Sequence, residues 1–126
     1  MKLLLDTHAL VWSLTRSDRL PARVQDLLSD RSNRVLASAL NAYEIEFKRQ
    51  RSEALAGLPA EIQAGAIAMG FEWLPVLAEH AVAAGRLPRL HGDPFDRLLV
   101  GQALVEQATI VTRDAWIAPY GAPVAW

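Results

Sequence analysis

The sequence has 126 residues, with 13 Lys and Arg residues against 14 Asp and Glu residues. At about 150 residues per domain, this length predicts a single domain over residues 1–126. Hydrophobic residues make up 52% of the chain and charged residues 21%, which excludes a disordered or collagen-like protein. A formal net charge of -1 excludes a strongly basic protein that binds nucleic acid by bulk electrostatics alone, so any such contact must be local.

The sequence contains no cysteine, which excludes disulfides, thiolate catalysis and zinc-finger sites. Asp6 interrupts the apolar run at residues 3–5, whereas the hydrophobic part of a secretory signal needs about seven residues. Apolar stretches also stay well below the roughly 18 residues of a membrane span. We therefore expect a soluble, cytoplasmic protein.

Short apolar runs alternate with amphipathic segments along the chain. In chain order we predict a strand at 3–5, a helix reaching 12–14, a helix that begins between 18 and 21 and ends before a polar loop at 29–33, a strand at 35–37, helices at 39–51 and 60–69, a strand at 71–74, a helix at 78–84, a loop at 87–92, a helix at 95–107, a strand at 109–111 and an edge strand at 123–125. This alternation predicts an α/β fold in which helices cover both faces of a parallel sheet built from right-handed β-α-β units.

Two aspartates come shortly after predicted strands. Asp6 follows the strand at 3–5 directly, and Asp114 lies three residues after Val111. In open α/β sheets, ligands bind beyond the carboxyl ends of the strands, so both aspartates are candidate site residues. Asp is also among the best helix N-caps, and each of the two can equally be a cap for the helix that follows.

The apolar helix at 95–107 is preceded by Asp93 and Pro94, which are typical of a helix N-cap and a first helical position. Asp96 lies within this helix, and its neighbours three and four positions away include no basic residue. The helix N-terminus offsets only about 0.3 to 1 kcal/mol of its charge. Asp96 is therefore expected to need a cation from elsewhere in the fold.

The helix at 39–51 carries Leu40, Tyr43 and Phe47 at spacings of three and four, which marks one face of a 3.6-residue period. Glu44 lies closer to the centre of this face than Glu46 does, so we prefer Glu44 as a site residue. The alternative for Glu44 is a surface ion pair with Lys48 at the favourable four-residue offset.

The predicted topology brings Asp6, Glu44, Asp96 and Asp114 to one end of the sheet. Four carboxylates within a few ångströms cannot all stay ionised unaided, so either some are protonated or a divalent cation neutralises them. Ligation by oxygen alone favours Mg²⁺ or Mn²⁺. A cluster of this kind supports phosphoryl chemistry, in which the metal lowers the pKa of water and stabilises charge on the phosphate.

Four segments in this order resemble PIN-domain proteins, specifically the VapC-type ribonuclease toxins of bacterial toxin–antitoxin pairs. The segments are Leu4 to Trp12, Ser38 with Tyr43 to Lys48, Leu87 to Leu99, and Thr112 to Asp114. The resemblance covers nearly the whole chain. It implies a PIN-like three-layer α/β/α fold with a short central parallel sheet of four or five strands.

The resemblance also implies Mg²⁺- or Mn²⁺-dependent cleavage of RNA, a homodimer, and a cognate antitoxin protein whose tail fills the groove. The implied catalytic and metal-binding residues are Asp6, Glu44, Asp96 and Asp114, supported by Thr7, Ser38, Asp93 and Thr112. Asn41, Tyr43 and Gly101 depart from the family's pattern, where Ser, Trp and Ala are usual. A glycine at position 101 is expected to cost the helix roughly 0.5 to 1 kcal/mol relative to Ala.

The charge balance is compatible with an RNA substrate. Apart from the four proposed ligands, ten acidic residues remain against 13 basic ones, most of which are Arg. Arg binds phosphate through two parallel hydrogen bonds and stacks on unpaired bases. The candidate substrate-binding residues are Lys48, Arg49, Arg51, Arg97 and Arg113, and the alternative for each is a solvated surface charge.

Two other enzyme classes are excluded by individual residues. A phosphatase of the haloacid dehalogenase type places a second Asp two residues after the first, where this chain has His8. A receiver domain needs a Lys late in the chain, and Lys48 is the last one. The remaining alternative is a non-catalytic PIN-like module that binds RNA or protein. Loss of an acid would indicate it, and this sequence keeps all four.

Overall fold

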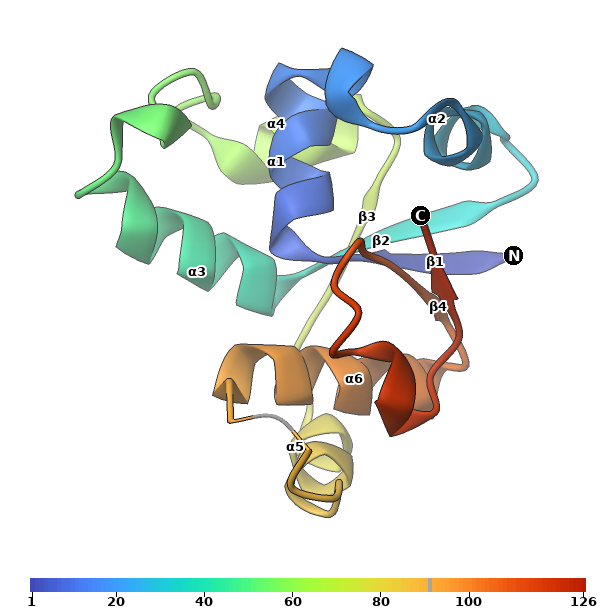
Figure 1. Ribbon diagram of the computed structural model, residues 1–126. Coiled ribbons are helices and arrows are strands. Elements are labelled where there is room, and N and C mark those ends of the chain that lie inside the picture. The colour runs from blue at the N-terminus through green and yellow to red at the C-terminus, as the bar shows by residue number, and fades with distance from the viewer. Residues whose placement is uncertain (91) are drawn as a thin grey trace.

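The computed structural model describes residues 1–90 and 92–126, and in these residues a five-stranded parallel sheet has helices on both faces (Figure 1). The strands are β1 (Lys2–Leu5), β2 (Arg34–Ser38), β3 (Glu72–Leu74), β4 (Thr109–Val111) and β5 (Val124–Ala125), in the order β3-β2-β1-β4-β5. The helices are α1 (Thr7–Thr15), α2 (Ala22–Ser29), α3 (Ala39–Arg49), α4 (Ile62–Ala68), α5 (Ala78–Gly85) and α6 (Pro94–Glu106), with 3-10 turns at Ser17–Arg19, Glu53–Leu55 and Ala118–Tyr120. The predicted α/β fold class, with a central parallel sheet of four or five strands, is confirmed.

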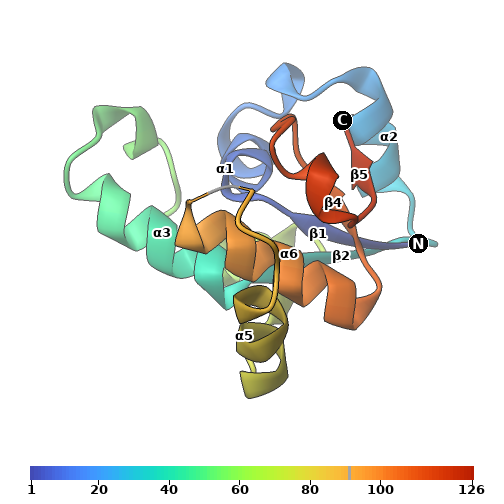
Figure 2. The ribbon, with the colours of Figure 1, turned by 60° about the horizontal axis from the view of Figure 1, so that its bottom comes forward.

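Alternate residues of β1 face opposite helical layers, as the two-residue period of a strand requires. Leu3 and Leu5 pack with α1, α2 and α4, whereas Leu4 packs with α6 on the other face. All three side chains are fully buried. Figure 2 shows α5 and α6 on the face opposite α1 and α2.

The strand register sets which residues meet at the carboxyl edge of the sheet. Leu5 of β1 lies opposite Val111 of β4, and the Asp6 N–H donates to the Val111 carbonyl at 3.1 Å. The residues that follow β1 and β4 are therefore neighbours. Helix α3 starts at the same edge, directly after β2. His91, in the predicted loop at 87–92, lies outside the described residues.

The buried face of α3 differs from the apolar face that the sequence predicts. Tyr43 and Phe47 are 60% and 54% exposed, and the buried residues of this helix are Leu40, Asn41 and Ile45. The two aromatic rings stack on each other at a centroid distance of 6.1 Å. The spacing of three and four predicts the helix but not which of its faces packs on the core, because a polar residue that finds hydrogen-bond partners can be buried.

Gly101 allows α5 and α6 to approach each other closely. A Cβ at this position would lie 2.8 Å from the Ala84 Cβ, the Ala84 nitrogen and the His80 carbonyl oxygen. The expectation that this glycine only weakens the helix is therefore incomplete, because its missing side chain makes room for the backbone of α5. In the described part of the chain, no helix is long and apolar enough to cross a membrane.

Candidate functional site

The four predicted acidic ligands line one pocket of about 530 Å³. Asp6 comes from the end of β1, Glu44 from α3, Asp96 from the first turn of α6 and Asp114 from the segment after β4. Lys48 and Arg113 also line this pocket. The fold thus brings acidic and basic groups from four distant segments of the sequence to one edge of the sheet.

Asp6 is both a helix cap and a site residue. Its Oδ1 accepts a hydrogen bond from the Ala9 nitrogen at 2.7 Å, so it caps α1 as the sequence allows. Burial raises the pKa of this carboxyl group, and the charge of Asp114 acts in the same direction. Hydrogen bonds to Thr112 and Ala9 oppose the rise in pKa.

Thr112 connects the two aspartates at the carboxyl edge. Its hydroxyl group is hydrogen-bonded to Asp6 and accepts a hydrogen bond from the Asp114 nitrogen at 3.0 Å. Asp114 in turn accepts from the Trp116 nitrogen at 2.9 Å, which closes a turn. Thr112 is almost fully buried, and it links the Asp6 carboxyl group to the main chain of Asp114.

Both carboxylate oxygens of Glu44 are held by neighbouring side chains. The Thr7 hydroxyl donates to Oε1, and Lys48 Nζ pairs with Oε2 at 2.6 Å. The Glu44 side chain is 15% exposed, against 51% for Glu46, which pairs with Arg49 instead. The ion pair between Glu44 and Lys48, which the sequence suggests as the alternative to a site role for Glu44, therefore forms between two residues that both line the pocket.

Asp93 and Asp96 have different roles at the start of α6. Asp93 Oδ1 accepts from the Phe95 nitrogen at 2.8 Å and from the Asp96 nitrogen at 3.4 Å, with Pro94 at the first helical position. Asp93 is therefore the N-cap of α6. Its hydrogen bond to the Asp96 nitrogen holds Asp96 in the first turn, where Asp96 lines the pocket.

The predicted substrate-binding residues separate into two groups. Lys48 and Arg113 line the carboxylate pocket, and both also line a larger groove beside it together with Arg51. Arg49 lies on the other side of α3, where it donates to the Pro59 carbonyl at 3.1 Å. Its remaining partner is Glu46, so its contacts are structural.

The contacts of Arg97 do not support a role in substrate binding. Its guanidinium group donates to the carbonyl oxygens of Ala84, Leu87 and Pro88 at 2.8 to 3.0 Å. These carbonyls belong to the end of α5 and the segment that follows. The Ala84 and Pro88 carbonyls also accept backbone hydrogen bonds, so Arg97 adds side-chain donors that tie α6 to the end of α5.

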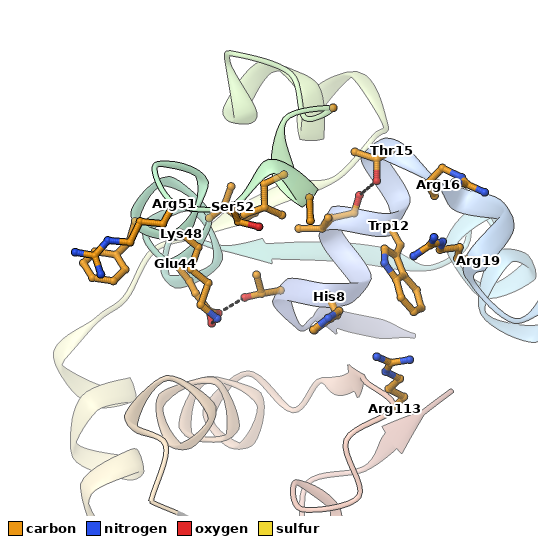
Figure 3. Close-up of a pocket in the computed structure, with 17 residues that line it drawn as sticks. His8, Trp12, Thr15, Arg16, Arg19, Glu44, Lys48, Arg51, Ser52 and Arg113 are labelled. Atoms are coloured by element: carbon orange, nitrogen blue, oxygen red, sulfur yellow. Dashed lines mark hydrogen bonds and ion pairs between the residues drawn. The ribbon is translucent and has the colours of Figure 1, made fainter.

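The larger groove has a volume of about 1000 Å³ and shares Thr7, His8 and Glu44 with the carboxylate pocket. Figure 3 shows His8 and Trp12 of α1 on one side, Glu44 and Lys48 of α3 with Arg51 just after this helix on the other, and Arg113 beside Trp12. The Arg113 guanidinium carbon lies 4.9 Å from the Trp12 ring centroid, a cation–π contact. Basic and aromatic groups thus extend the surface away from the acids.

The family model of the PIN domain matches residues 3–120 of the sequence. The chain belongs to the PIN domain family. The predicted resemblance to PIN-domain proteins is thereby confirmed. No curated protein sequence matches this chain.

Solved structures with the same fold include toxin–antitoxin complexes. VapBC2 from Rickettsia felis, bound to a DNA fragment from its promoter, is 18% identical, covers 99% of this chain and 98% of its own, and has a TM-score of 0.73. DNA-bound VapBC from Salmonella typhimurium gives 18% identity, 99% and 97% coverage and a TM-score of 0.72. FitAcB from Neisseria gonorrhoeae is 19% identical, covers 97% of this chain and 95% of its own, and has a TM-score of 0.69. The TM-scores show a shared fold, and at these low identities the comparison shows the fold alone.

The donor set of this PIN domain fits a hard divalent cation. Its pocket is lined by five acidic residues, the four predicted ligands and Asp93, and burial raises the pKa of Asp6, whose charged form an added cation would stabilise. Within residues 1–90 and 92–126, no three acidic or histidine side chains are already drawn together around a common point. Glu44 is turned to Lys48, and like charges repel one another across the pocket.

Asn41 is a polar residue of the site that the sequence analysis does not identify as functional. It lines the carboxylate pocket and is 1% exposed. Together with Ser38 it forms a reciprocal capping box at the start of α3. The Ser-x-x-Asn spacing resembles a capping-box pattern, and this is the signal by which it could be found.

Proposed function

We propose that this PIN domain is a divalent-metal-dependent endoribonuclease, the VapC-type toxin of a toxin–antitoxin pair. The observation that carries the proposal is the single pocket lined by Asp6, Glu44, Asp96 and Asp114. The PIN family membership and the fold shared with VapBC complexes support it.

Mg²⁺ or Mn²⁺ would be held by the oxygen atoms of these four carboxylates. When bound, such an ion lowers the pKa of water and stabilises the negative charge that grows on the phosphate oxygens. Thr112 and Thr7 hold the carboxyl groups of Asp6 and Glu44 in place. Ser38 and Asp93 cap the helices that carry Glu44 and Asp96.

Lys48 and Arg113 are the cations that bind the RNA phosphates in this proposal, with Arg51 further along the groove. Attack of water on phosphorus breaks the bond to the 3′ oxygen. The products then carry a 5′-phosphate and a 3′-hydroxyl group. Phosphate contacts of this type do not read sequence, so they favour no particular RNA.

The proposal includes a cognate antitoxin whose tail fills the groove of Figure 3, and a homodimeric toxin. The groove offers apolar and basic groups together, among them Trp12, Phe47 and Arg19, which suit an amphipathic segment. One of the structures with the same fold is of a member of the VapBC family of toxin–antitoxin systems, from Mycobacterium tuberculosis (17% identity, TM-score 0.60).

Cleavage of single-stranded RNA by the purified chain, with Mn²⁺ and with EDTA, tests this function. Asp6→Asn and Asp96→Asn are expected to lower the rate by about 100-fold or more, because each removes a charged ligand. Asp18→Asn is the matched control, since Asp18 is an exposed acid that pairs with Arg16.

Equal cleavage by the pocket variants and the wild type, or cleavage that persists in EDTA, would refute the proposal. RNA binding without cleavage at any Mn²⁺ concentration would favour the alternative, a non-catalytic PIN-like binding module.

A further inference from the structure

A row of buried and partly buried hydrogen bonds leads from the start of α3 to the Glu44 carboxylate. Asn41 Oδ1 accepts from the Ser38 nitrogen at 2.8 Å, and Asn41 Nδ2 donates to Thr7 Oγ1 at 3.1 Å. The Thr7 hydroxyl then donates to Glu44 Oε1. Asn41 thus lies one hydrogen bond from the main chain of β2 on one side and two hydrogen bonds from a site carboxylate on the other.

The direction of each bond in this row is fixed by the backbone. The Ser38 N–H can only donate, so the amide oxygen of Asn41 must face it and the amide NH₂ group must face Thr7. Thr7 Oγ1 receives that hydrogen, which leaves its own hydrogen for Glu44. Glu44 Oε1 is therefore held as an acceptor, while Lys48 holds the other oxygen.

The start of the row is anchored in the core. Ser38 Oγ accepts from the Leu40 nitrogen at 3.0 Å and donates to Gln102 Oε1 at 2.6 Å. Gln102 Nε2 donates to the Pro75 carbonyl at 3.2 Å. Ser38 and Gln102 are both fully buried, so α6 fixes the position of the cap that orients Asn41.

We propose that Asn41 is a positioning residue, which acts through Thr7 to set the orientation of the Glu44 carboxylate toward a bound divalent cation. The inference rests on the proposed function of the carboxylate pocket. Polar groups that orient metal-binding side chains typically change metal affinity or activity by about 10 to 100-fold when they are removed. Asn41 departs from the Ser expected at this position, so the arrangement belongs to this chain.

Helix capping alone does not account for this contact. The capping box uses the Asn41 oxygen, whereas its NH₂ group reaches from α3 to α1. Asn41→Asp keeps the oxygen that caps α3 and replaces the donor to Thr7 with a negatively charged oxygen. A purely capping role therefore predicts that any change in the site comes from this charge and does not depend on Thr7. A positioning role predicts that the Thr7 hydroxyl turns from Glu44 toward the new carboxylate.

A double-mutant cycle between Asn41→Asp and Thr7→Val tests the proposal. The readouts are Mn²⁺ affinity by titration calorimetry, kcat and KM for RNA, and the melting temperature. We expect Asn41→Asp to change Mn²⁺ affinity and kcat about tenfold in the wild type but at most about twofold in the Thr7→Val background. Because the added charge acts in both backgrounds, only this coupling measures the effect through Thr7.

Thr7→Ser keeps the hydroxyl group and is expected to retain wild-type values, whereas Thr7→Val is not. Asn33→Asp is the control. Asn33 does not line the pocket, and its side chain is hydrogen-bonded to the N-terminal amino group and to the Leu27 carbonyl. KM is expected to change little in every variant. Equal effects of Asn41→Asp in the two backgrounds, or equal values for Thr7→Ser and Thr7→Val, would overturn the proposal.

A readout without metal separates this inference from the proposed function. The ¹³C resonance of the Glu44 carboxyl carbon in the metal-free protein is expected to shift in Asn41→Asp and in Thr7→Val, but not in Asn33→Asp. A wild type that neither binds Mn²⁺ nor cleaves RNA would refute the function alone. An unchanged Glu44 resonance in the two site variants would refute the positioning role, whatever the activity.

Discussion

Lys48 and Arg113 line both the carboxylate pocket and the groove beside it, whereas Arg97 is bound to backbone carbonyls at the end of α5. Residues of the same charge therefore have different roles. A cation that faces open space can bind a phosphate, and a cation that is already saturated with carbonyl acceptors contributes to stability instead.

Arg113→Gln is expected to weaken binding of a single-stranded RNA oligonucleotide and to lower the slope of log K against log salt by about 0.7, because one phosphate contact is lost. Fluorescence anisotropy in EDTA measures this without cleavage. Arg97→Gln is expected to leave the slope unchanged and to lower the melting temperature, since three hydrogen bonds that tie α6 to the end of α5 and the segment after it are lost. The reverse pattern would show that the two roles are wrongly assigned.

Asp6→Asn is expected to raise the melting temperature in EDTA by a few degrees, or roughly 1 kcal/mol. Burial, the main cause, raises the pKa of Asp6, so a neutral side chain of the same shape relieves the cost of a buried charge. Asn is as good a helix cap as Asp. The same variant is expected to lose the stabilisation that Mn²⁺ gives the wild type. Lower stability in EDTA would contradict the cost ascribed to the buried charge.

The acidic residues of the site can be predicted from the sequence, because an acid that follows a strand or lies in the first turn of a helix is recognisable from the sequence pattern. The sequence does not identify Asn41, since the burial of a polar residue depends on partners such as Thr7 that lie far away in the chain. Nor does it separate Arg97 from Arg113. That distinction depends on where the segment after α5 lies.

Among the helices, α5 and α6 pack most closely where Gly101 faces Ala84 and His80. Gly101→Ala is expected to lower the free energy of unfolding by about 1 to 3 kcal/mol, because the new Cβ meets backbone atoms of α5 that must move. Helix propensity alone predicts the opposite sign. Urea denaturation measures the difference.

Gly85→Ala in α5 is the matched control for that substitution. Among the described residues, a Cβ at Gly85 would meet nothing within 4 Å. This variant is expected to gain about 0.4 to 1 kcal/mol from lower entropy of the unfolded chain. A stable Gly101→Ala variant would show that the two helices can separate at little cost.

At the level of elements, the apolar runs predict all five strands because the sheet is buried on both faces. The helices are also where their periodicity places them. The face of α3 is not predicted, since the Tyr43 ring packs on Phe47 and on Phe95 outside the core. A 3.6-residue period predicts a helix, but which face of the helix is buried depends on the residues that pack against each face.

Over the whole molecule, Glu106 joins three elements of the fold. It accepts from His80 Nε2 of α5 at 2.9 Å and lies 3.5 Å from Lys2 Nζ of β1. The ring of His80 is fully buried, and its Nδ1 accepts from the Leu77 nitrogen. The proton of the neutral ring is therefore on Nε2, where it is donated to Glu106.

The hydrogen bond from His80, with a contribution from Lys2, lowers the pKa of Glu106 below its ordinary value of 4.5. A group with a lowered pKa in the folded state stabilises the protein above its ordinary pKa, and this stability is lost as the pH falls through the folded-state pKa. Glu106→Gln is therefore expected to cost up to about 1 kcal/mol at pH 7. The difference from the wild type should shrink at pH values below 4.5. A difference that does not vary with pH in urea denaturation would contradict this linkage.

The proposed function requires that the carboxylates at the carboxyl edge of the sheet hold a divalent cation. Titration of ¹⁵N-labelled protein with Mn²⁺ tests it most directly, because the paramagnetic ion broadens the signals of nearby amides. Saturable broadening is expected first at residues 6–8, 44, 93, 95, 96 and 112–114, and Asp6→Asn should abolish it. Broadening that is spread over exposed acids such as Asp18 and Asp30, or that is unaffected by Asp6→Asn, would contradict the claim.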